Sequence, residues 1–162
     1  MANSSIIASL KKNVINAMCQ DSDICSFIDS DDYTGEGLKN THIFTYNKNP
    51  NTINKTITFV TVQVNTVKRD KNGTFVTPKL IITIFTHNEH MDIKFGKKVQ
   101  EYNRNDYLGM LIDEKFNNTT KYGNLGTLEL VSNNEGVATD KFLYRQLVFE
   151  TVDFDQSLCE RW

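Results

Sequence analysis

The chain has 162 residues, of which 39% are hydrophobic and 23% charged, and its formal net charge at pH 7 is -2. This composition is typical of a folded protein with one domain, and it excludes a disordered chain. The absence of a basic excess argues against a dedicated nucleic-acid binder, and no apolar run approaches the roughly 20 residues of a membrane-spanning helix. The start of the chain also lacks the features of a signal peptide. We therefore expect one domain over residues 1–162, with no membrane partner.

The first predicted element is an amphipathic helix. Its apolar residues recur at three- and four-residue spacing, which is typical of a helix that packs on a core; they are Ile6, Ile7, Leu10, Val14, Ala17 and Met18. The aspartate-rich segment from Asp21 to Glu36 then predicts a solvated acidic loop. A calcium loop requires glycine at its sixth position and glutamate at its twelfth. Counted from Asp29, these positions hold Thr34 and Asn40, so the calcium pattern fails.

Two long strands dominate the middle of the chain, after a short strand predicted at His42–Tyr46. Thr56–Val67 and Lys79–Thr86 are dense in β-branched and aromatic residues, which favour strands. Asn72 and Gly73 between them supply the positive φ angles of a tight hairpin turn. We therefore predict a central antiparallel hairpin.

The pattern within this hairpin predicts how it is covered. Val60, Val62 and Val64 share one face, whereas Ile57 and Phe59 break the alternation. This break predicts either a bulge near Phe59 or a strand buried on both sides there. Both faces of the second strand are largely apolar, so we expect a covering layer on each face.

The last third of the chain predicts a second helix and a second hairpin. Asn103–Asp106 offers helix caps, and the helix that follows has an apolar face of Tyr107, Leu108, Leu111, Ile112 and Phe116. The hairpin consists of a strand at Thr127–Val131, a turn at Ser132–Gly136 and a strand at Lys141–Phe154. In the final strand we place Phe142, Tyr144, Val148, Val152 and Phe154 on one face and Leu143, Leu147 and Phe149 on the other. The predicted order is α-β-β-β-α-β-β, so we expect an α+β fold with a mostly antiparallel sheet and two main helices packed on one face.

Residues that carry chemistry are sparse. The three cysteines, Cys19, Cys25 and Cys159, lack metal-ligand spacing and predict reduced thiols in a cytosolic protein. His87, Glu89, His90 and Asp92 could hold a divalent metal, which is the basis of an alternative interpretation as a small nuclease-like, metal-dependent enzyme. They lack the H-E-x-x-H frame, and the chain has no nucleophile elbow, Walker loop or dinucleotide fingerprint. We therefore predict a polar loop here, with no catalytic, cofactor-binding or metal-binding residues.

Several stretches resemble the tail terminator and neck (tail-completion) proteins of long-tailed bacteriophages. The resemblance covers roughly residues 1 to 155, mostly as topology and pattern rather than as a chemical signature. The resembling stretches are His42–Tyr46, the strand that runs into His87, Asn103–Leu108, Gly126–Asn133 and Tyr144–Phe154.

This resemblance implies a non-enzymatic virion protein. Members of the family form rings, commonly hexameric, that cap the tail tube and join it to the head connector. The implied partners are further copies of the chain, the tail tube protein, the connector and DNA that passes through the channel without sequence-specific binding. The implied location is the virion neck, assembled in the host bacterial cytoplasm, and no cofactor is expected.

Two groups of residues are candidates for contacts in such a ring. We expect Lys68, Arg69, Asp70 and Lys71, at the tip of the central hairpin, to contact a neighbouring copy or the tube; a solvated tip is the alternative. We expect Asp29, Asp31 and Asp32 to line the channel, where like charge would let DNA slide rather than bind.

Overall fold

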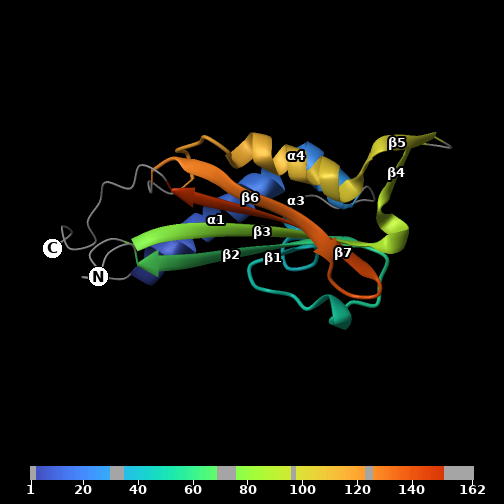
Figure 1. Ribbon diagram of the computed structural model, residues 1–162, viewed down its shortest axis with the longest axis horizontal. Coiled ribbons are helices and arrows are strands. Elements are labelled where there is room, and N and C mark those ends of the chain that lie inside the picture. Colours follow the sequence, from blue (N-terminus) through green and yellow to red (C-terminus); the bar gives the residue numbers. More distant parts are fainter. Residues whose placement is uncertain (1–2, 30–34, 69–75, 96–97, 123–125, 152–162) are drawn as a thin grey trace.

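The fold consists of a five-stranded sheet with helices on one face and a separate two-stranded hairpin at one end (Figure 1). The structure is a computed structural model and describes residues 3–29, 35–68, 76–95, 98–122 and 126–151. The expected α+β class with a mostly antiparallel sheet is confirmed.

The main sheet has the strand order β1-β2-β3-β7-β6. Its strands are β1 (Ile43–Phe44), β2 (Thr58–Lys68), β3 (Val76–His87), β6 (Leu128–Val137) and β7 (Phe142–Thr151). All neighbours pair antiparallel except β1, which runs parallel to β2. The ladder between β2 and β3 is unbroken, so the predicted antiparallel pairing is confirmed and the predicted bulge near Phe59 is wrong. The predicted turn at Asn72 and Gly73 lies outside the described residues. The alternative prediction, a strand buried on both sides near Phe59, is confirmed. Phe59 and its neighbour Val60 lie on opposite faces of the sheet and are both fully buried.

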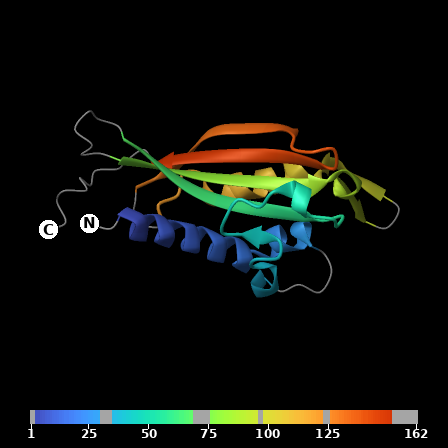
Figure 2. The same ribbon diagram turned by 90° about the horizontal axis from the view of Figure 1, so that it is seen from below.

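The helices are α1 (Asn3–Gln20), α2 (Ser22–Ile28), α3 (Gly35–Leu38) and α4 (Arg104–Phe116), with single 3-10 turns η1 (Pro50–Thr52) and η2 (Asn88–His90). The two main helices, α1 and α4, were predicted from their apolar periodicity. Both pack on the same face of the sheet, and α1 runs along β2 (Figure 2). The side chain of Asn103 caps α4 by accepting a hydrogen bond from the Asp106 amide at 2.9 Å.

The acidic segment after α1 is a helix over part of its length, so the prediction of a solvated loop was wrong there. Asp21 caps α2, because its carboxylate accepts hydrogen bonds from the amides of Asp23 and Ile24, both at 3.1 Å. Ile24, Cys25 and Ile28 lie at helical spacing and are buried. The aspartates therefore lie at the start of a short buried helix and not in a solvated loop.

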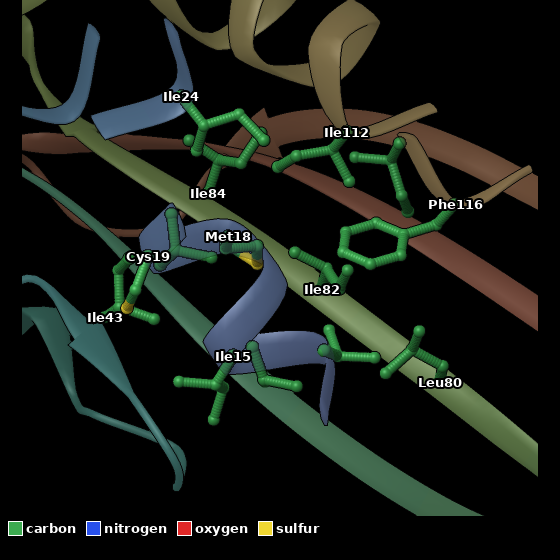
Figure 3. Packing of buried hydrophobic residues seen from close by; sticks show 14 of the residues in the cluster. Ile15, Met18, Cys19, Ile24, Ile43, Leu80, Ile82, Ile84, Ile112 and Phe116 are labelled. Carbon is green, nitrogen blue, oxygen red and sulfur yellow. The ribbon is translucent and has the colours of Figure 1, made fainter. Parts of the chain in front are cut away.

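The main core lies between the sheet and the helices. Figure 3 shows Ile15 and Met18 of α1 and Ile112 and Phe116 of α4 gathered around Ile82 of β3. Their strand partners alternate along β2, β3 and β7; they are Val60, Val62, Val64, Leu80, Ile82, Ile84, Leu147 and Phe149. The predicted division of β7 into two faces is confirmed for Phe142–Phe149, because Leu147 and Phe149 lie in this core and Phe142 does not.

A smaller aromatic cluster occupies the opposite face of the sheet. Phe59 lies at its centre, stacked on Phe85 at 4.8 Å between ring centroids and edge-to-face with Phe44 and Phe142. Ile53 and Ile57 pack against this cluster from the segment before β2. The expected cover on both faces is therefore only partly confirmed, because Ile81 and Val148, farther along this face, remain half-buried.

The second hairpin differs from its prediction in length. β6 continues through the predicted turn at Ser132–Gly136 and ends at Val137, and one residue, Val131, bulges out of the ladder. The structure also contains an unpredicted pair, β4 (Asp92–Phe95) and β5 (Lys98–Asn103), which extends beyond one end of the sheet (Figure 1).

Replacing Gly35 with alanine should lower the free energy of unfolding by about 2–3 kcal/mol. A Cβ atom at Gly35 would overlap the backbone carbonyl oxygen of Cys19, so α3 would have to move away from the end of α1. Gly37→Ala is the matched control, because Gly37 lies in the same helix and is exposed. Urea denaturation of both variants checks this, and equal midpoints would contradict a close approach of α3 to α1.

Candidate functional site

The residues that were predicted to contact a neighbour or the channel are only partly described. Lys68 is the last residue of β2, and its side chain, like Arg69, Asp70 and Lys71, lies outside the described residues. Asp31 and Asp32 also lie outside them. Asp29 follows α2, and its carboxylate lies 3.4 Å from Nε2 of the buried His42.

The side chains of the alternative metal site, His87, Glu89, His90 and Asp92, do not come together. His87 accepts a hydrogen bond from the Glu89 amide at 3.1 Å, and its ring packs edge-on against Phe142. His90 instead reaches Thr58, on the face of the sheet that the helices cover. Among the described residues, no group of three or more His, Cys, Asp or Glu side chains could hold a metal ion.

A chain of hydrogen bonds connects His90 to α4. Nδ1 of His90 lies 2.7 Å from the Thr58 hydroxyl, which lies 3.1 Å from the Thr86 hydroxyl. Thr86 donates to the side-chain oxygen of Asn105 at 2.6 Å, so its own oxygen must accept from Thr58. Thr58 in turn must accept from His90. The neutral imidazole therefore carries its proton on Nδ1.

Arg104 is the buried cation of the same region. It is 9% exposed, and its guanidinium donates to the carbonyl oxygens of His90 and Phe27, both at 2.7 Å, and of Asp92 at 3.4 Å. These carbonyls belong to η2, α2 and β4, so one side chain joins α2 to the distant segment formed by η2 and β4. The Phe27 carbonyl lies in the last turn of α2, where a positive charge is favourable. We infer a structural role for Arg104.

Burial also changes the acid–base behaviour of this end of the molecule. Burial, with the charge of Arg104 as a second cause, lowers the pKa of His90 from 6.5 to about 4. Burial lowers the pKa of His42 as well, although Asp29 opposes it. Both imidazoles are therefore neutral at pH 7.

Stability should consequently fall as the pH is lowered from 7 to 5. The unfolded chain binds a proton at His90 near pH 6.5, whereas the folded chain does so only near pH 4. His90 should therefore contribute a loss on the order of 1–2 kcal/mol over this interval. Urea denaturation at a series of pH values should give a flatter profile for His90→Gln than for His87→Ala, which serves as the control. Equal slopes would contradict this assignment.

The cysteines show no sign of reactivity in the described part. Cys19 and Cys25 are free and buried, and burial raises the pKa of Cys25 to about 11. Such thiols are largely protonated at pH 7 and chemically inert. Cys159 lies outside the described residues.

The two edges of the main sheet are the most conspicuous incomplete feature. On one edge, β1 pairs with β2 only opposite Val60 and Thr61. On the other edge, the segment after α4 covers the start of β6: Leu128 exchanges backbone hydrogen bonds of 2.9 and 2.7 Å with Thr119 and Asn118. Within the described part of the chain, the later halves of both strands have a partner on one side only. Unpaired strand edges of this kind accept additional strands.

The face of the sheet opposite the helices carries a hollow of about 400 Å³. Its floor is polar: Gln146 donates to the Thr83 hydroxyl at 3.1 Å, and Thr61 and Gln63 lie beside them. The described lining contains no carboxylate or histidine, and its titratable side chains are those of Lys48 and Tyr144.

These features define an α+β protein whose sheet has two incompletely paired edges and whose described residues form no cluster that could hold a metal ion. The chain belongs to the YomW family, whose model matches residues 3–151. This family is associated with bacteriophages, which agrees with the coarser part of the resemblance. No curated protein matches the chain. In the described residues, no helix is long and apolar enough to cross a membrane.

Proposed function

We propose that this protein is a structural component of the phage neck. It forms a ring, which we expect to be hexameric, that caps the tail tube and joins it to the head connector. It acts without catalysing a reaction, in the virion neck, after assembly in the host bacterial cytoplasm. DNA passes through the ring without sequence-specific binding, in keeping with the net charge of -2.

The observation that carries this proposal is the pair of incomplete sheet edges. A ring built from identical subunits needs two different surfaces that complement each other head to tail. β2 and β6 are the two edge-forming long strands of the sheet, and each is only partly covered by its own chain. Membership of a phage-associated family supports a virion role.

The native mass of the purified protein tests the proposal. Light scattering should give a single oligomer of several subunits, and negative-stain images should show rings with a central hole. The purified tube protein should bind these rings at one end of the tube and stop its growth. A protein that remains monomeric, with and without the tube protein, would contradict the proposed function.

A further inference from the structure

The direction of the backbone groups on β2 follows from one observed hydrogen bond. The Val60 amide donates to the His42 carbonyl, outside the sheet, at 2.7 Å. In an antiparallel ladder, alternate residues point their N–H and C=O groups to the same side. Val64, Thr66 and Lys68 therefore point these groups away from β3, along the half of β2 that β1 does not reach.

The same argument applies to β6. The Leu128 amide donates outward to the Thr119 carbonyl at 2.9 Å, and the Leu130 amide donates to the Asn117 side chain at 3.0 Å. The bulge at Val131 adds one residue, which shifts the alternation by one position. Beyond it, Asn133, Glu135 and Val137 point their backbone groups outward, and the described part of the chain gives these groups no backbone partner.

The unpaired later halves of β2 and β6 match in length, in the face that their outward-pointing residues occupy and in direction. Each has three outward-pointing residues. All six positions lie on the helix-covered face: those of β2 continue the every-second-residue series of Val60 and Val62, and Asn133 pairs with the core residue Leu147. Three successive antiparallel pairings separate β2 from β6, so the two strands run in opposite directions. A neighbouring copy in the same orientation would therefore place its β6 antiparallel to β2.

We propose that β6 of one copy pairs with β2 of the next and joins their sheets into one. Val137 lies opposite Val64, Glu135 opposite Thr66 and Asn133 opposite Lys68. The contact rests on the self-association proposed above and assigns its surface. It also covers Val137, which is 72% exposed and the most exposed large hydrophobic residue in the described part of the chain.

This register displaces each copy along the strands. Within one copy, Glu135 lies in the same row as Val60, through Arg145 and Ile84. In the contact it lies opposite Thr66, six residues farther along β2, which is a step of about 20 Å. Side by side, the four long strands of one copy span about 19 Å across the sheet. A step of similar length along the strands inclines them by roughly 45° to the ring axis, which is close to the strand tilt of closed β-barrels.

Cysteine pairs placed in separate molecules test the contact. In a Cys159→Ser background, Thr66→Cys protein mixed with Glu135→Cys protein should give a disulfide-linked dimer on mild oxidation, because opposed residues lie within disulfide range. Asn134→Cys replaces Glu135→Cys in the control, because its side chain points to the other face of the sheet. We expect at least tenfold more cross-linked dimer than in this control.

The outcomes separate this contact from the proposed function. An oligomer that gives no more cross-linking than the control overturns the contact and leaves the ring standing. Cross-linking of Thr66→Cys or Glu135→Cys protein with itself also overturns the contact. It would show that the same strand of two copies pairs with itself about a two-fold axis. A wild-type protein that remains monomeric with and without the tube protein overturns both proposals.

A proline substitution provides a second test that needs no oxidation. Thr66→Pro removes an outward N–H that β3 does not use, so the contact should weaken at least tenfold while circular dichroism shows an intact sheet. Thr66→Val keeps the N–H and should assemble like the wild type. Unchanged assembly of a folded Thr66→Pro variant would overturn the contact.

Discussion

Replacing Arg104 with lysine should lower the free energy of unfolding by about 3 kcal/mol. The guanidinium reaches three carbonyl oxygens on α2, η2 and β4 at once. A single ammonium group on a different stem cannot span them, so buried acceptors lose their donors. Urea denaturation, with hydrogen exchange at α2 and β4, measures the loss and its location.

Lys11→Met is the matched control for Arg104. Lys11 also donates to a backbone carbonyl, that of Thr45 at 2.7 Å, but it does so at an exposed position. Its replacement should cost less than about 1 kcal/mol, because water replaces the lost donor. Similar losses for Lys11→Met and Arg104→Lys would show that burial of the guanidinium is not the source of its effect.

Replacing Phe59 with alanine should have the largest effect, a loss of about 4 kcal/mol. Phe59 is fully buried, and its ring contacts Phe44, Phe85 and Phe142. Its removal leaves a cavity at the centre of the aromatic cluster, which also holds the segment before β2 on the sheet. Thermal and urea denaturation measure the loss.

Tyr46→Ala is the control for Phe59. Tyr46 contacts the same cluster through Phe44, but it is 50% exposed, so its loss should be below about 1 kcal/mol. Phe59→Leu, which refills part of the cavity, should lie between the two. If Phe59→Ala cost no more than Tyr46→Ala, the cluster would not be a second core.

Much of the fold could be predicted because its signals are local. The periodicity of Leu108, Ile112 and Phe116 defines α4, and the β-branched runs around Val62 and Ile82 define the central hairpin. Such patterns depend on few distant contacts. The parallel pairing of β1 with β2 could not be predicted in this way, because it depends on how the chain returns to the sheet after α3.

The failures have physical causes that involve long-range contacts. The aspartates before Ile24 suggested a solvated loop, yet α2 forms because its apolar side enters the core against α1 and α4. The polar residues Ser132 to Gly136 have turn composition, but β7 holds them in a strand through its own ladder.

The buried polar network was the part of the site that sequence reasoning missed. Thr58 and Thr86 interrupt the apolar pattern at paired positions, which is a signal, but their partner Asn105 comes from another element. Arg104 was interpreted as the start of a helix, and nothing in its neighbours indicates burial. Of the predicted contact residues, Asp29 is described beside His42, and Lys68 is described only as the last backbone position of β2; a role for either in a ring remains a prediction.

The strand order has a consequence for synthesis of the protein. β3 lies between β2 and β7, and Phe142 follows His87 by 55 residues. At ribosomal rates the hairpin of β2 and β3 waits about 3–11 s for the start of β7, the strand that pairs with the free side of β3. During that interval the edge of β3 that later pairs with β7 has no partner, and apolar side chains such as Ile82 lie beside it. Nascent chains on one messenger RNA can associate through such an edge. Completion of β7 therefore ends the period in which the growing chain is most prone to aggregate.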